Sequence, residues 1–248
     1  MQIFIKGNYL NNFTRLKIEK LERSKIVVVN VHGSYGTSGE ENSKSEFLGK
    51  EILKKNIGSM VYFSSSRNWN IYDRSNDALR KKAFEFKTFS EEVKDLEDTL
   101  DLIISSSKDL FNSEKIKIYI VAESLGGKII SAIAGKYEQV EKIILSGAGI
   151  APTSLTDPIL STYPPIEFIK NTTSLYKGKL MSLQGSKDEV VSLDSQDELF
   201  EAYTNASFKS KKIIEGANHS FSSINGENKQ LAYQYYVDQV VEFLQLDP

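Results

Sequence analysis

The stretch IYIVAESLGGKIISAIAG, residues 118–135, changes its hydrophobic pattern near its centre. Residues 118–122 form a continuous apolar run, which is typical of a strand buried on both faces of a sheet. After two glycines the apolar residues return with a different period, as in a helix that packs on a core. Ser124 therefore lies between a buried strand and a buried helix. We expect a tight turn there, with the serine hydroxyl above the sheet.

The strand pattern recurs on both sides of this stretch. Apolar, β-branched runs occupy residues 26–33, 59–65, 115–123, 140–149, 179–186 and 208–219. Helical patterns occupy residues 89–111, 125–137, 192–204 and 228–245. Strands that alternate with helices predict parallel βαβ units and a mostly parallel, doubly wound sheet, that is, an α/β fold. Residues 1–25 alternate like a hairpin and predict antiparallel strands at one edge.

Two segments interrupt the alternation. Residues 66–88 hold the only tryptophan, and residues 150–177 hold four of the five prolines. We expect a single domain over residues 1–248, in which both segments are insertions at strand ends and the second forms a small lid. Among the helix starts, Ser90 before two glutamates and Ser192 are the predicted N-caps.

Composition narrows the function classes. The chain has 248 residues with 31 Lys and Arg against 33 Asp and Glu, a net charge of -2 that gives no general attraction to nucleic acid or an anionic membrane. There is no cysteine, which excludes disulfides, thiolate metal sites and a cysteine nucleophile. Residues 1–10 do not read as a signal peptide, and no window is apolar enough for a membrane-spanning helix. A cytoplasmic location is expected.

The turn at Ser124 has the residues that an exposed nucleophile needs. The positions two before and two after the serine must be small because the backbone is crowded there. Gly126 meets this demand, and Ala122 stands where a first glycine is usual. The backbone N–H of Leu125, at the start of the helix, is placed to donate to an oxyanion.

A second oxyanion donor is expected from VNVHGSYG, residues 29–36. This segment follows an early strand, and ligands of open α/β sheets bind at the carboxyl edge of such strands. The N–H of Ser34 is the candidate partner of Leu125. His32 is interpreted as a structural residue that positions this loop rather than as a base.

The remaining catalytic candidates follow two later strands. Asp188 lies in a loop just past residues 179–186, whereas its rivals Asp194 and Asp197 fall inside a helical pattern. His219 follows the last strand and is the only histidine after the serine, because the chain has two histidines in all. The order Ser124, Asp188, His219 allows the carboxylate to orient the imidazole and the imidazole to activate the hydroxyl.

Over residues 25–245 these motifs resemble the serine hydrolases of the α/β-hydrolase superfamily. The resemblance implies the α/β-hydrolase fold, with Ser124 as nucleophile, His219 as base and Asp188 as its orienter. It also implies that Ser34 and Leu125 form the oxyanion hole. The chain departs from the family pattern at Ala122, and it lacks the triple-glycine oxyanion loop of one lipase branch.

The implied reaction is hydrolysis of a carboxylic ester or thioester of a small acyl substrate through an acyl-enzyme, with no metal or organic cofactor. A peptidase or amidase is an alternative, as is a non-catalytic protein that binds a small molecule or a protein. Apolar residues of the expected lid indicate a partly apolar pocket or simple packing onto the body: Leu160, Tyr163, Phe168 and Tyr176. Basic residues of the first insertion either recruit an acidic substrate or partner, or form a solvated helix face: Arg67, Arg74, Arg80, Lys81 and Lys82.

Overall fold

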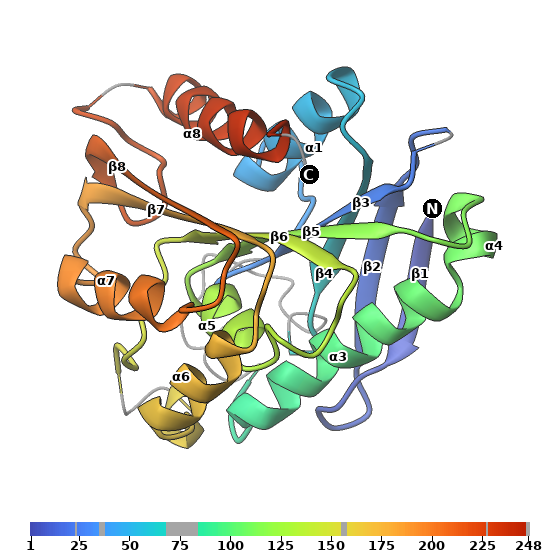
Figure 1. Cartoon of the computed structure of the whole chain (residues 1–248), viewed down its shortest axis with the longest axis horizontal. Coiled ribbons are helices and arrows are strands. Elements are labelled where there is room, and N and C mark those ends of the chain that lie inside the picture. Colours follow the sequence, from blue (N-terminus) through green and yellow to red (C-terminus); the bar gives the residue numbers. More distant parts are fainter. Residues whose placement is uncertain (23, 35–37, 68–83, 155–157, 227, 247–248) are drawn as a thin grey trace.

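The computed structural model describes residues 1–22, 24–34, 38–67, 84–154, 158–226 and 228–246. Within these residues the chain forms one eight-stranded sheet with the strand order β1-β2-β4-β3-β5-β6-β7-β8 (Figure 1). The strands are β1 (Gln2–Lys6), β2 (Phe13–Glu19), β3 (Ile26–Val31), β4 (Ser59–Ser64), β5 (Lys117–Glu123), β6 (Val140–Ser146), β7 (Lys179–Lys187) and β8 (Phe208–Asn218).

The strand directions confirm the predicted sheet. β1 and β2 form an antiparallel hairpin, and β2 also pairs antiparallel with β4. From β4 through β3, β5, β6 and β7 to β8 every pairing is parallel. The carboxyl ends of these parallel strands therefore meet at one edge, where loops from distant parts of the sequence can form one site.

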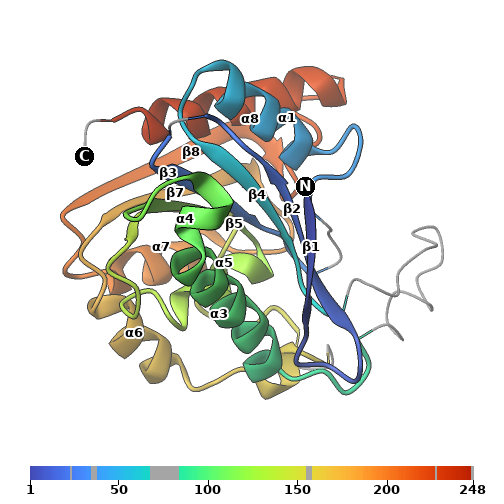
Figure 2. The ribbon, with the colours of Figure 1, turned by 90° about the vertical axis from the view of Figure 1, so that its right-hand side faces the viewer.

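Helices cover both faces of the sheet. The helices are α1 (Lys44–Lys54), α3 (Phe89–Ser105), α4 (Ser107–Phe111), α5 (Leu125–Ser131), α6 (Ile166–Ser174), α7 (Leu193–Ala202) and α8 (Lys229–Leu244), with a 3-10 turn η2 (Leu160–Thr162). Figures 1 and 2 show α1 and α8 on one face, and α3, α5, α6 and α7 on the other. Each face has its own buried core, with Leu48 and Val240 in the first and Leu96 and Ile129 in the second.

Helix α1 was not among the predicted elements. Its N-cap is Ser43, whose hydroxyl accepts a hydrogen bond from the Glu46 N–H. Gly49 lies in its interior and weakens the helical signal, since glycine is a poor helix former. The structure shows why a glycine is there: a Cβ on Gly49 would lie 1.8 Å from the Tyr62 hydroxyl of β4. Helix α1 can pack this closely on the sheet only without a side chain at that position.

Several helix boundaries differ from the prediction, and the helix predicted over residues 125–137 ends at Ser131. The N-cap of α3 is Thr88 rather than Ser90, because the Thr88 hydroxyl accepts from the Glu91 N–H while the Glu91 carboxylate accepts from the Thr88 N–H. The helix predicted over residues 89–111 is interrupted at Ser106, within a run of three serines that favour helix ends over helix interiors. The N-cap predicted at Ser192 is confirmed, since its hydroxyl accepts from the Ser195 N–H.

The segment 150–177 contains regular structure that its prolines concealed. Helix α6 begins directly after Pro165, which serves as its N-cap. Ile169 is fully buried, and the Thr173 hydroxyl donates to the Ala202 carbonyl of α7 at 3.1 Å. Nine residues of this segment thus form the crossover helix between β6 and β7. Of the segment 66–88, residues 68–83 lie outside the described residues.

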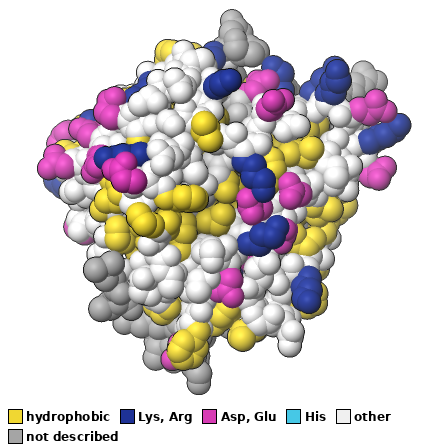
Figure 3. Space-filling model, turned by 60° about the horizontal axis from the view of Figure 1, so that its bottom comes forward, with side chains coloured by type: hydrophobic (Ala, Val, Ile, Leu, Met, Phe, Trp, Pro, Cys, Tyr) yellow, Lys and Arg dark blue, Asp and Glu magenta, His cyan; other side chains and the backbone are white. Residues whose placement is uncertain are grey.

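The described surface mixes charges of both signs. On the face turned forward in Figure 3, Lys and Arg side chains are interspersed with Asp and Glu around a central band of hydrophobic side chains. Among the described residues, no helix is both long and apolar enough to cross a membrane.

Candidate active site

Ser124 occupies a strained turn at the carboxyl edge of the sheet. It lies between β5 and α5 with φ 49° and ψ -113°, a conformation that L side chains rarely adopt. Its N–H donates to the Ser146 carbonyl at the end of β6 at 2.8 Å, which fixes the turn against the neighbouring strand. Strain of this kind persists only where the surroundings impose it, and it turns the side chain out of the strand–helix junction.

The small neighbours of Ser124 have clear packing reasons. A Cβ on Gly126 would lie 2.5 Å from the Val31 carbonyl oxygen and 2.8 Å from that of His32, so the start of α5 can approach the end of β3 only through a glycine. Ala122 is fully buried between Val31 of β3 and Leu145 of β6. One methyl group fits there, which explains why the usual first glycine can be an alanine.

His219 and Asp188 meet Ser124 from two other loops. His219 Nε2 lies 3.1 Å from Ser124 Oγ, and His219 Nδ1 lies 2.9 and 2.8 Å from the two carboxylate oxygens of Asp188. His219 directly follows β8 and Asp188 directly follows β7. The backbone of Gly147, at the end of β6, lies against the imidazole ring. The structure therefore brings together the three side chains that the sequence order predicted.

The surroundings of Asp188 favour its ionised form. Burial of the carboxyl opposes ionisation, but the hydrogen bond from His219 and those from the N–H groups of Val191 and Val190 outweigh it, so the pKa of Asp188 is lowered. Both N–H groups donate to Oδ1 at 2.9 Å. A carboxylate accepts only, so His219 carries its proton on Nδ1 and leaves Nε2 free to accept the proton of Ser124. Asp194 and Asp197 lie on α7, as the sequence indicated.

The two expected oxyanion donors belong to segments that adjoin the serine: Leu125 follows it in the chain, and Ser34 follows Gly33. Leu125 is the first residue of α5, where a backbone N–H has no partner within the helix. Gly33 lies against Ser124, since a Cβ on it would be 3.2 Å from the Ser124 Cβ. The Gly33 carbonyl accepts from His32 Nδ1 at 2.8 Å and from Arg67 Nη2 at 2.9 Å. In a trans peptide the N–H points opposite to the C=O, so these bonds turn the Ser34 N–H away from Arg67.

His32 has the structural environment that the sequence interpretation assigned to it. Its Nε2 accepts from the Ser65 N–H at 3.2 Å, which leaves the proton on Nδ1 for the bond to Gly33. Burial, followed by the positive charge of Arg67, lowers the pKa of His32 to about 3. The ring is therefore neutral at ordinary pH and holds the loop in place.

Arg67 corrects one sequence interpretation. It was grouped with an exposed basic cluster, yet it is fully buried and forms an ion pair with Glu92 at 2.9 Å. It also donates to the Gly33 and Ser34 carbonyls, which makes it a support of the expected oxyanion loop, the segment after β3 that begins with residues 32–34. The only sequence signal for this role is its place three residues after the end of β4. The other four residues of the cluster lie outside the described residues: Arg74, Arg80, Lys81 and Lys82.

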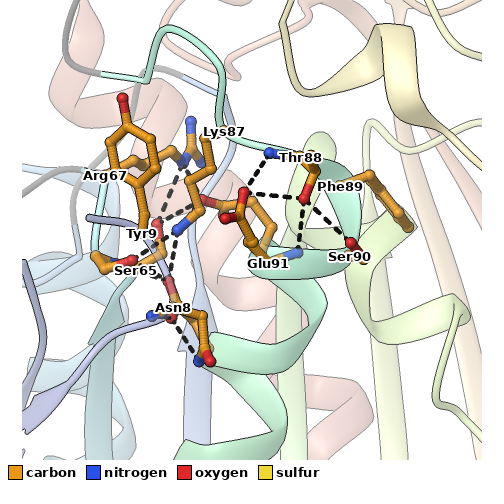
Figure 4. A network of polar contacts seen from close by, with 12 residues as sticks. Asn8, Tyr9, Ser65, Arg67, Lys87, Thr88, Phe89, Ser90 and Glu91 are labelled. Atoms are coloured by element: carbon orange, nitrogen blue, oxygen red, sulfur yellow. Dashed lines mark hydrogen bonds and ion pairs between the residues drawn. The ribbon is translucent and has the colours of Figure 1, made fainter. Parts of the chain in front are cut away.

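Arg67 belongs to a larger buried network of charges (Figure 4). Lys87 Nζ lies 3.0 Å from a Glu92 oxygen, 2.6 Å from an Asp95 oxygen and 2.7 Å from the Ser66 hydroxyl. Burial opposes ionisation of both carboxyls, but the nearby cations prevail, and the pKa values of Glu92 and Asp95 are lowered. Two cations and two carboxylates thus balance one another beneath the oxyanion loop.

This balance leads to a stability prediction. Lys87→Met leaves two buried carboxylates with Arg67 as the nearest remaining cation of the network, and we expect it to lower the free energy of unfolding by about 3–5 kcal/mol. Urea unfolding measures the change. Lys94→Met is the matched control, because the Lys94–Asp98 pair is exposed and should contribute at most about 1 kcal/mol. Equal midpoints for the two variants would contradict the role given to the network.

The apolar residues of the expected lid serve different purposes. Leu160 and Tyr176 are buried, and Tyr176 packs edge-on against Tyr203, so these two fit the packing interpretation. Tyr163 packs edge-on against Phe89, whereas Phe168 is exposed. Lys128 of α5, whose pKa burial lowers to about 7, donates to the Gly149 and Ala151 carbonyls and holds the start of this segment.

Solved structures provide the comparison with known proteins. No family model matches the sequence, and no curated protein matches it in sequence. The chain is similar in structure to the esterase Est1E from Butyrivibrio proteoclasticus (TM-score 0.62, 12% identity, 97% of this chain and 99% of that one). It is also similar to a Pyrococcus furiosus esterase (0.68, 15%, 99% and 89%) and to a dienelactone hydrolase from Anabaena variabilis (0.65, 14%, 98% and 96%). At these identities the likeness concerns the fold.

Proposed function

We propose that this chain, which has the α/β-hydrolase fold, is a serine hydrolase that cleaves a carboxylic ester or thioester of a small acyl substrate. One observation carries the proposal: the continuous contact from Ser124 Oγ to His219 Nε2 and from His219 Nδ1 to Asp188, at the carboxyl edge of the parallel strands. Three loops that are far apart in the sequence meet there, beside a strained turn that leaves Ser124 partly exposed.

The mechanism follows from which atom holds each proton. His219 Nε2 takes the Ser124 proton while Oγ bonds to the carbonyl carbon, and the carbonyl π electrons move to oxygen. The Leu125 and Ser34 N–H groups stabilise that oxyanion. The carbonyl then re-forms, the bond to the leaving group breaks, and the leaving group takes the proton from His219. Water repeats these steps on the acyl-enzyme, which releases the acid and restores Ser124.

Asp188 acts through His219 rather than on the substrate. Its carboxylate holds Nδ1–H in place and stabilises the imidazolium that forms when His219 accepts the proton. Burial of the Asp188 side chain, which has no exposed surface, strengthens this interaction. Ser124 as a whole is partly exposed, as access of a substrate to its hydroxyl requires.

Hydrolysis of p-nitrophenyl esters of increasing acyl length tests the proposed substrate class. We expect turnover with short acyl chains, a clear maximum at one length, and much slower cleavage of matched p-nitroanilides. The maximum reports the depth of the acyl pocket. Faster cleavage of the anilides would favour a peptidase or amidase instead.

Covalent labelling tests the nucleophile independently of substrate choice. A fluorophosphonate should modify one residue, Ser124, in a 1:1 ratio, because only an activated hydroxyl attacks phosphorus. Peptide mass spectrometry identifies the site. Ser131 is an internal comparison, since its hydroxyl is buried and donates to the Gly127 carbonyl. A folded protein that neither reacts nor hydrolyses any ester would instead be a non-catalytic binder.

Other parts of the proposal concern context. We expect the protein to work without a metal or organic cofactor, on a small molecule rather than nucleic acid, as one domain and in the cytoplasm. The lid role of residues 150–177 also stays a prediction. Measurement of activity after exhaustive dialysis against a chelator checks the expectation that no metal is needed.

A further inference from the structure

Lys44 is a buried cation on the opposite face of the sheet from α5. It is the first residue of α1, its side chain is 9% exposed, and its Nζ lies 3.1 Å from a carboxylate oxygen of Glu123. The same Nζ donates to the Ser220 carbonyl at 3.2 Å. Burial of a lysine lowers stability unless the ammonium group is paired and hydrogen-bonded. These contacts therefore fix the position of the Lys44 ammonium group.

The two partners of Lys44 are the chain neighbours of two proposed catalytic residues. Glu123 precedes Ser124, and Ser220 follows His219. Hydrogen bonds within the His219 loop, such as that from the Ser222 N–H to Asn218 Oδ1 at 3.0 Å, fix the shape of the loop. Lys44 instead fixes the position of the loop relative to β5, because it holds both with one ammonium group.

Aromatic rings fix the position of the ammonium group itself. Nζ lies 4.9 Å from the centre of the Phe221 ring and 4.4 Å from that of Tyr236, both fully buried. A desolvated ammonium near aromatic faces is held by the ring quadrupoles. Phe221 belongs to the His219 loop, so the loop contacts Lys44 through a carbonyl and a ring.

Glu123 also links this cation to β3, the strand that leads to the oxyanion loop. Its second carboxylate oxygen accepts from Asn30 Nδ2 at 3.3 Å. Asn30 in turn accepts from the Ser38 hydroxyl, which lies beyond that loop. The polar contacts below the active site thus join the segments of the nucleophile, the base and the oxyanion loop.

We propose that Lys44 is a positioning residue: through Glu123 and Ser220 it sets the distance between Ser124 and His219. The inference rests on the proposed function. Lys44 touches neither substrate nor reacting atoms, so its effect should fall on kcat and not on KM. A misplacement of the base by about 1 Å can cost about 100-fold in rate.

The test uses the double variant Lys44→Met/Glu123→Gln, which removes the cation without leaving a charged Glu123 behind. The matched control is Lys50→Met/Glu46→Gln, which removes from the same helix a surface ion pair whose lysine is exposed. We expect kcat for the best p-nitrophenyl ester to fall by about 10- to 100-fold in the first variant, with KM within about twofold. The control should keep the kcat of the unmodified protein.

Spectra of ¹⁵N-histidine-labelled protein give a readout that does not need ester hydrolysis. The chain has only two histidines, so His219 is observed beside His32, which reports that the protein is folded. We expect the His219 ring signals to shift or broaden in the first variant alone, while those of His32 stay in place. Unchanged His219 signals, or changed signals with an unchanged kcat, would overturn the proposal. A protein that cleaves no ester would refute the proposed function, and the His219 signals would still decide the role of Lys44.

Discussion

Ser124→Ala is expected to lower kcat for ester hydrolysis by about 10⁶-fold, with substrate binding almost unchanged. The substitution removes the atom that forms the acyl-enzyme, and no hydroxyl remains 3.1 Å from His219 Nε2. Only the oxyanion donors and the binding site would then act on the substrate. Steady-state hydrolysis of the best p-nitrophenyl ester, with the unmodified protein quantified by active-site labelling and the variant by absorbance, measures the loss.

His219→Ala should cost nearly as much, and the double variant should be no slower than either single one. Residues that act as a unit are not additive, because the first loss removes the function of the others. Ser105→Ala is the control for the substitution itself, since Ser105 is exposed at the end of α3 and donates to the Leu102 carbonyl. If Ser124→Ala kept more than about 1% of the activity, another group would be the nucleophile.

Asp188→Asn is expected to lower kcat by about 10⁴-fold while the protein keeps its stability. The introduced amide has nearly the same shape as the carboxylate that it replaces, and its oxygen can still accept from the N–H groups of Val190 and Val191. The amide nitrogen then faces His219 Nδ1, where a carboxylate oxygen stood at 2.8 Å. That nitrogen only donates, and the amide oxygen is already occupied by two N–H groups, so we expect His219 to move its proton to Nε2, where it can no longer accept from Ser124.

Kinetics and spectra together test this tautomer argument. The ¹⁵N signals of His219 should exchange their protonated and unprotonated patterns between Nδ1 and Nε2. Asp194→Asn is the matched control: Asp194 was the rival carboxylate in the sequence, and it is exposed in the first turn of α7. An Asp188→Asn variant that is fully active, or an Asp194→Asn variant that is inactive, would refute the role given to Asp188.

The parallel core was predictable because its signal is local. The run at 59–65 differs from β4 by a single residue at one end, since a strand buried on both faces is apolar along most of its length. The run at 208–219 also matches β8 to within one residue, although β8 is an edge strand whose residues are mostly exposed or partly buried. The turn at Ser124 was predictable for a related reason: a strand that leads directly into a helix needs small residues beside the bend. The spacing of glycine and serine indicates such a turn without any information on which other segments of the chain contact it.

Elements that depend on non-local packing were missed or misread. Helix α1 was hidden by Gly49, whose reason for being there is the Tyr62 hydroxyl of another element. Helix α6 was hidden by the prolines before it. Arg67 looked like a surface charge, because composition cannot show that Glu92, 25 positions further along the chain, is buried beside it.

The sequence by itself determined the fold class, the chain order of Ser124, Asp188 and His219, and the small residues around the turn. Each of these follows from local patterns of residues along the chain. Only the tertiary structure decided the distances among the three side chains, the tautomer of His219 and the buried contacts of Arg67 and Lys44. Ser124 and His219 are 95 positions apart, and Lys44 and Ser220 are 176 positions apart. Contacts across such separations arise from how β3, β5 and β8 lie in one sheet and how α1 packs on it, and no local pattern of residues encodes that geometry.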